Sequence, residues 1–148
     1  MNEVFIPVSP GELLDKITIL RIKAARIGDG QKLVNVRLQL EQIETIWRDS
    51  GAAQKVGAEE QALQRANERL WDIENRIREK EMAQAFDAEF IALARSICVY
   101  NDERAFIKSR INTQLGSQMV DEKFYPGTVR TPDRPPEPAR SWNIQRKE

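Results

Sequence analysis

The chain has 148 residues, of which 41% are hydrophobic and 31% are charged, a balance typical of one folded domain with a strongly charged surface. Its 23 basic and 23 acidic side chains give a formal net charge of zero, which disfavours nucleic-acid binding because such proteins usually carry a basic excess. The chain has no His and a single Cys, so we expect no metal and no other cofactor.

We expect no targeting signal at the beginning of the chain. Residues 1–10 contain no basic segment followed by an apolar stretch, and no apolar run in the sequence is long enough to span a bilayer. We therefore expect a cytoplasmic protein with no membrane partner. Residues 3–8 are short and apolar, and Pro7 limits them to an edge strand or an extended arm.

The first helix is predicted over residues 10–27. Ser9 and Glu12 form a capping box, Pro10 fits the first helical position, and Gly28 is well placed to end the helix. Apolar residues then recur every three or four positions, as they do on one face of a helix. They are Leu13, Ile17, Leu20, Ala24 and Ile27.

The same spacing continues along the chain and predicts further helices over residues 31–49, 58–82 and 87–115. Asp87 is placed to cap the last of these helices, and Gly116 to end it. At 1.5 Å per residue this helix would be on the order of 40 Å long. That length favours an elongated hairpin or a paired dimer over a compact globule.

These elements predict an all-α fold, with four helices over residues 1–125 forming antiparallel hairpins in a bundle. The narrow apolar stripes are typical of coiled-coil seams. Two hairpins would pack together either within one chain or through a twofold axis. Residues 126–148 are rich in proline and are expected to form an extended or disordered tail.

A first polar cluster lies on the first predicted helix. Glu12, Lys16 and Lys23 fall near one face of this helix, with Asp15 beside them. Free N–H groups at a helix N-terminus attract anions, so this edge is a candidate for anion binding. The alternative, which we favour, is an ordinary ion pair between Glu12 and Lys16 on a solvated face.

A second polar cluster lies on the last predicted helix, where Asn101, Arg104, Lys108 and Asn112 recur at spacings of three and four. Arg104 takes a seam position that should be apolar, and a charge there is costly unless it is paired. We expect it to meet a carboxylate or to set the helix register. Contact with a ligand and exposure to water are the alternatives.

Residues on the third and fourth predicted helices carry weaker signals. Asn67, Trp71, Glu74 and Arg78 lie close together in the sequence, but a Trp beside an apolar stripe is more often in a core or interface than in a stacking shelf. Cys98 is expected to be a buried and inert thiol. The sequence contains no phosphate-binding loop and no metal-ligand spacing, and it identifies no catalytic residue.

Three segments resemble an uncharacterised family of short bacterial proteins, a domain of unknown function. The likeness covers about residues 4–125 and stops before the proline-rich tail, which we take to be peculiar to this protein. The resemblance implies no activity, but it indicates that both polar clusters belong to a shared pattern. The segments are VSPGELLDKITILRIK at 8–23, LWDIENRIR at 70–78 and NDERA at 101–105, with Lys108, Arg110, Ile111, Asn112, Gly116, Ser117, Glu122 and Lys123.

Two functions remain open at this point. We favour a non-catalytic helical interaction or scaffold protein that forms a homo-oligomer, as a dimer, and that serves a protein partner. The alternative is a small cofactor-free binder or enzyme for an anionic small molecule, using electrostatic stabilisation by basic side chains. It predicts one pocket in which the basic residues of the two clusters converge. These residues are Lys16, Lys23, Arg104 and Lys108.

Overall fold

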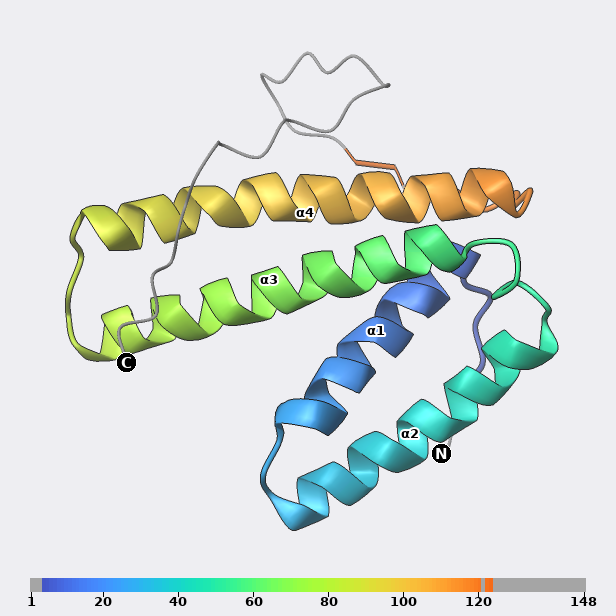
Figure 1. Ribbon diagram of the computed structural model, residues 1–148, viewed down its shortest axis with the longest axis horizontal. Helices are drawn as coiled ribbons and strands as arrows, with labels where there is room; N and C mark the ends of the chain where they lie inside the picture. The colour runs from blue at the N-terminus through green and yellow to red at the C-terminus, as the bar shows by residue number, and fades with distance from the viewer. Residues whose placement is uncertain (1–3, 121, 124–148) are drawn as a thin grey trace.

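The computed structural model describes residues 4–120, 122 and 123, and its regular elements are four α-helices (Figure 1). The described residues contain no strand, so the predicted all-α fold is confirmed. Each helix begins and ends within one residue of the range expected from apolar spacing. The helices are α1 (Pro10–Arg26), α2 (Gly30–Asp49), α3 (Gly57–Met82) and α4 (Ala88–Gln114).

Local side-chain caps explain where three of the helices begin. The Oγ of Ser9 accepts the backbone N–H of Glu12 at 3.2 Å, and Pro10 is the first residue of α1. Asp29 and Asp87 cap α2 and α4 in the same way, each accepting the N–H group three residues on at 3.0 Å. Such a cap satisfies a backbone donor that has no partner inside the helix and contributes about 1 kcal/mol.

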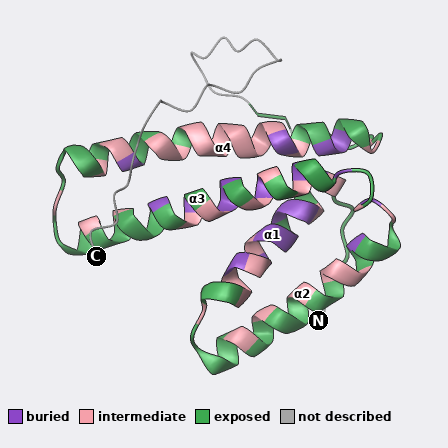
Figure 2. Ribbon diagram, in the orientation of Figure 1, coloured by how far each residue is buried: buried purple, intermediate pink, exposed green. Residues whose placement is uncertain are grey.

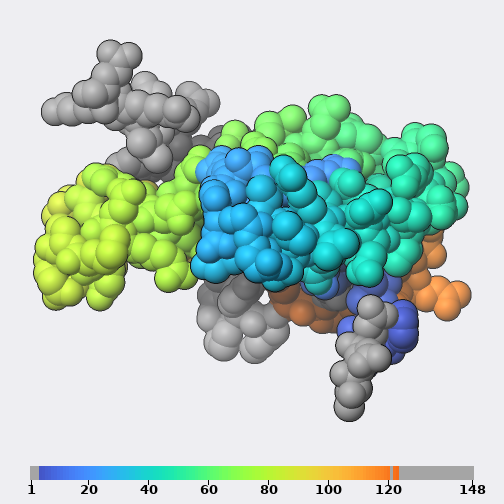
Figure 3. Space-filling model, turned by 90° about the horizontal axis from the view of Figure 1, so that it is seen from below, coloured from blue at the N-terminus to red at the C-terminus, as the bar shows by residue number. Residues whose placement is uncertain are grey.

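The helices form two hairpins, α1–α2 and α3–α4, which meet over only part of their length (Figure 1). Helix α1 packs against both α3 and α4, whereas α2 packs closely against α1 alone. The end of α3 and the beginning of α4 project beyond the first hairpin, as the yellow-green end in Figure 3 shows. The molecule is therefore a bundle at one end and a bare two-helix hairpin at the other.

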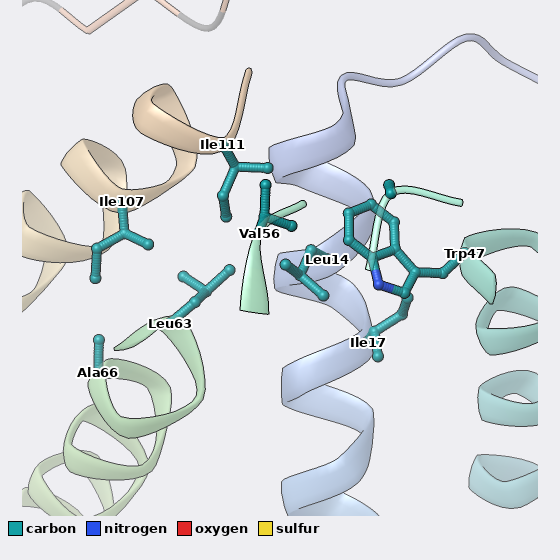
Figure 4. Packing of buried hydrophobic residues seen from close by; sticks show 9 residues of the cluster. Leu14, Ile17, Trp47, Val56, Leu63, Ala66, Ile107 and Ile111 are labelled. Carbon is teal, nitrogen blue, oxygen red and sulfur yellow. The ribbon is translucent and has the colours of Figure 1, made fainter. Parts of the chain in front are cut away.

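The hydrophobic core lies where α1 meets α3 and α4 (Figure 4). Leu14 and Ile17 of α1 pack with Leu63 of α3 and Ile111 of α4, and all four side chains are fully buried. Trp47 is the one buried residue of α2, and it joins the same cluster. Full burial of an apolar side chain contributes roughly 1.5–3 kcal/mol. Because these fully buried side chains lie together, most of the stabilising burial is concentrated at this junction.

Large apolar side chains face solvent on the parts of the helices that extend away from the junction (Figure 2). On α2, Leu38 is 58% exposed and Ile46 is 59% exposed. At the far end of the α3–α4 hairpin, Met82 is 79% exposed and Ile91 is 56% exposed. None of the four helices is long and apolar enough to cross a membrane.

Some expectations from the sequence are wrong, and others lie beyond the described residues. Cys98, expected to be buried, is exposed, so neither α1 nor α3, the described helices that pack on α4, covers it. Residues 4–9 have no regular secondary structure, so they do not form the edge strand that was one of two alternatives. The predicted tail, residues 126–148, lies outside the described residues.

Candidate functional site

The two predicted polar clusters meet at the junction of α1, α3 and α4, where Arg104 reaches Asp15. The guanidinium Nε of Arg104 donates to Oδ1 of Asp15 at 2.8 Å, and its Nη2 donates to Oδ2 of the same carboxylate. The side chain of Asp15 is 2% exposed and that of Arg104 is 29% exposed. Arg104 thus meets a carboxylate across the helix interface, which is one of the two arrangements that we favoured for a charge in a seam.

Asn67 of α3 joins this pair from the third side. Its side-chain amide donates to Oδ1 of Asp15 and to Oγ1 of Thr18, each at 2.9 Å. Thr18 donates in turn to the backbone carbonyl of Asp15 at 2.8 Å. One buried carboxylate therefore connects three helices. A buried polar network whose members all have partners resists rearrangement, because each broken bond would leave a desolvated group.

Arg104 keeps its positive charge in this setting. The hydrogen bonds that Arg104 donates to Asp15 raise the pKa of Arg104 above its ordinary value. The negative charges of Asp15, Glu12 and Glu74 act in the same direction, while burial opposes them. An arginine is already charged at every pH at which proteins are usually folded. Arg104 therefore acts as a fixed cation and not as a proton donor or acceptor.

A second ion pair crosses the same interface nearer the N-terminus of α1. The ammonium group of Lys108 contacts the carboxylate of Glu12. We expected Glu12 to pair with Lys16 on its own helix, and that expectation is wrong because α4 brings the ammonium of Lys108 against it. Lys16 is exposed and Lys23 is half-buried, and neither forms an ion pair with another described residue.

The first turn of α1 has no free N–H group to offer an anion. Pro10 has no N–H, and that of Gly11 donates to Oδ1 of Asn112 at 2.7 Å. The N–H of Glu12 donates to Oγ of Ser9 at 3.2 Å, and that of the next residue donates to the Ser9 carbonyl at 3.0 Å. Anion sites at helix N-termini depend on such groups being available. The anion hypothesis therefore lacks its backbone donors.

Helices α1 and α4 come very close together at Gly11. A Cβ atom on this residue would lie 2.6 Å from the carbonyl oxygen of Lys108 and 2.9 Å from Oδ1 of Asn112. Asn112 is 5% exposed, and its backbone carbonyl also accepts the N–H of Ser117 at 2.8 Å. Its amide thus connects the start of α1 to the end of α4.

A family model described as a family of unknown function (DUF6165) matches residues 4–141. The chain belongs to this family. The match includes all four helices and continues past residue 125 into the proline-rich segment. Our expectation that this segment is peculiar to the protein is therefore wrong for most of its length. Neither a curated protein nor a solved structure matches the chain.

In this DUF6165 protein most of the candidate residues lie together at the junction. Among them is Asn101, whose Oδ1 accepts a hydrogen bond from Nη1 of Arg104 at 3.5 Å. The exceptions are Lys16 and Lys23. The sequence grouped Asn67 with the half-buried Trp71 and not with the first helix, and it did not reveal the contacts of Thr18 or Gly11. The candidates that make contacts at the junction are Glu12, Asn101, Arg104, Lys108 and Asn112.

A small hollow beside the junction is lined by Lys108, Asn112, Ser117 and Lys123, among others. Its volume is about 80 Å³, whereas small-molecule pockets usually measure about 300–1,000 Å³. Of the four basic residues in the anion hypothesis, Lys108 alone lines this hollow. The carboxylate of Glu12 already neutralises the charge of Lys108. The described residues also contain no group of three or more potential metal ligands close to one another.

Proposed function

We propose that this protein is a non-catalytic helical interaction module that self-associates in the cytoplasm. One contrast carries the proposal. The basic side chains of Arg104 and Lys108 are engaged by carboxylates of α1, whereas the large apolar side chains of Met82 and Ile91 on the far α3–α4 hairpin face solvent. An exposed apolar surface larger than scattered single side chains usually marks a binding interface.

The binder of an anionic metabolite has weaker support. Of the four basic groups that would hold the anion, those of Arg104 and Lys108 are paired across a helix interface. The first-turn N–H groups of α1 have partners within the chain. An anion would have to displace a buried carboxylate, Asp15, in order to reach Arg104. Separating such a pair leaves a desolvated charge without a partner, which is strongly unfavourable.

Sedimentation velocity of the full chain over a series of concentrations tests the proposal. Self-association gives a mass above 17.1 kDa that rises with concentration and reaches a plateau. A monomer at every concentration contradicts it. In a parallel arm, melting curves with phosphate and with a tricarboxylate test the alternative, because a saturable rise in Tm requires a site in the folded state.

A further inference from the structure

Among the described residues, no helix covers the far half of the α3–α4 hairpin. Helix α1 packs on α3 and α4 at the junction only, and beyond it these two helices have each other as neighbours (Figure 1). The space-filling view shows this end of the hairpin standing clear of α1 and α2 (Figure 3). A pair of helices exposes both faces of its seam unless a further layer packs on one of them.

The sequence of α4 in this region is that of a helix buried on several sides. Between Ala88 and Tyr100 its only charged residues are Glu89 and Arg95. Leu93 is buried, yet Ile91, two positions earlier and on another face, is 56% exposed. A helix that is apolar all round is normally covered all round. Helix α3 covers one side of α4, so the other sides require a further partner.

The groove that α1 occupies at the junction continues along the hairpin. Beyond α1 an open groove of about 700 Å³ runs between α3 and α4. Of its lining residues on α3, Glu74 is the nearest in sequence to Asn67 at the junction, and its negative charge helps to raise the pKa of Arg104. Helix α1 thus covers the hairpin at the junction, and no other described helix covers the groove beyond it. Its lining residues are Glu74, Ile77, Arg78, Glu81, Met82 and Ile97.

The charged side chains on the two flanks of the hairpin differ in their pairing. On the flank away from the groove, Arg76 and Glu89 belong to a network of ion pairs within the chain. Along the groove, Glu74, Arg78 and Glu81 form no ion pair with any other described residue. This acidic–basic–acidic edge is complementary to a second copy running antiparallel, since each Arg78 can then face a glutamate of the other copy.

We propose that a second copy of this chain docks on this face, so that the far halves of two α3–α4 hairpins pack about a twofold axis as a four-helix bundle. The inference rests on the proposed self-association and specifies its surface. The interface comprises the groove together with Ile91 and Cys98, which lie two turns apart on the same side of α4 and are both exposed. The zero net charge of the chain means that two copies experience no net electrostatic repulsion.

Two matched variants test the surface. Ile91→Glu places a charge in the proposed interface, and Leu38→Glu places one on α2, at a residue that is 58% exposed. Both side chains face solvent in the single chain, so each variant should keep its helicity by circular dichroism. We expect Ile91→Glu to weaken self-association in sedimentation velocity by at least about tenfold, which corresponds to about 1.4 kcal/mol. We expect Leu38→Glu to leave it unchanged.

The outcomes separate the surface from the self-association itself. If Leu38→Glu abolishes association and Ile91→Glu leaves it intact, the proposed surface is wrong although the protein still self-associates. If the unaltered chain is monomeric throughout, both proposals fail, and binding to a different protein is then the remaining use of these apolar faces.

A measurement on the unaltered chain avoids any folding defect of a variant. Cys98 is the single thiol and lies in the proposed interface, so its alkylation by N-ethylmaleimide should slow severalfold as the concentration is raised through the association range. A Cys98→Ser, Leu38→Cys double variant is the control and should react at one rate throughout. If Cys98 reacts equally fast in the monomer and in the associated form, the surface is elsewhere.

Discussion

Gly11 lies at a contact between α1 and α4 that leaves no room for a side chain. The atom nearest to the position of a Cβ is the carbonyl oxygen of Lys108, at 2.6 Å. This oxygen belongs to the backbone of α4 and cannot move aside as the end of a flexible side chain could. The helices must therefore separate if residue 11 carries a side chain.

Gly11→Ala is accordingly expected to destabilise the protein by about 1–3 kcal/mol, the usual cost of overpacking, although Ala is the better helix former by about 1 kcal/mol. Urea unfolding followed by circular dichroism measures the change. Gly57→Ala is the matched control, because residue 57 also lies in a first helical turn and its Cβ would meet nothing within 4 Å. The control should be neutral or stabilising, and similar losses in both variants would contradict the close contact.

The pair of Asp15 and Arg104 makes a second prediction. Arg104→Met leaves a 2% exposed carboxylate without its cation, and we expect a loss of about 3–5 kcal/mol. The double variant Asp15→Leu, Arg104→Met removes both charges and should be more stable than Arg104→Met alone. Unfolding free energies of the two single variants and the double variant complete the cycle. A double variant that loses the sum of the two single losses would show that the two residues are not coupled.

The sequence predicted the chemistry of this site but not its geometry. An arginine in an apolar seam requires an opposite charge, and that much follows from Arg104 alone. Asp15 lies 89 positions away, and the spacing of apolar residues does not determine which faces of α1 and α4 meet. Glu12 shows the same limit, since Lys16 one turn away and Lys108 on another helix were both suitable partners by charge.

Helix boundaries are local properties, and they were predicted well. Caps such as Ser9 and Asp87, and apolar residues every three or four positions, act within a few residues of the helix that they define. Coverage of a helix face is not local. The apolar run around Cys98 predicted burial, yet no helix of the same chain packs on that side of α4.

Asp87 connects the start of α4 to the end of α3. Its carboxylate accepts a hydrogen bond from the ammonium of Lys80 at 2.7 Å and another from the backbone N–H of Phe90 at 3.0 Å. These two hydrogen bonds lower the pKa of Asp87 below its ordinary value. Hydrogen bonds from Arg76 and Lys80 likewise lower the pKa of Glu89. Both groups therefore bind protons less readily in the folded hairpin than in the unfolded chain.

Because these folded-state pKa values are lowered, the contacts stabilise the hairpin end above the unfolded-state pKa and are lost as the pH falls through the folded-state values. We expect the first turn of α4 to exchange its amide hydrogens more readily, relative to the junction, below about pH 4. Hydrogen exchange of the first turn of α4, measured across this pH range, tests this expectation. Asp87→Asn keeps a capping oxygen but has no charge, so its profile should be flatter. An unchanged profile in this variant would contradict the assignment to Asp87.

The distribution of burial over the whole molecule predicts how its stability is distributed. At the junction the side chains of Leu14, Leu63 and Ile111 are fully buried, whereas α2 buries Trp47 alone. We therefore expect hydrogen exchange at low concentration to be slowest in α1 and in the adjoining halves of α3 and α4, and faster in α2 and the far hairpin. Uniform protection along all four helices would contradict this picture.

The asymmetric anchoring of the α3–α4 hairpin also has a mechanical consequence. The buried network holds α3 at Asn67, and an ion pair joins Asp72 of α3 to Arg26, the last residue of α1. The helix then runs on to Met82, about 15 Å further at 1.5 Å per residue. The far hairpin is therefore a lever arm. A rotation of about 10° at the junction displaces its tip by about 3 Å over that length. A small displacement of Asp15 or Gly11 at the junction is thus amplified into a larger movement at the far end of the α3–α4 hairpin.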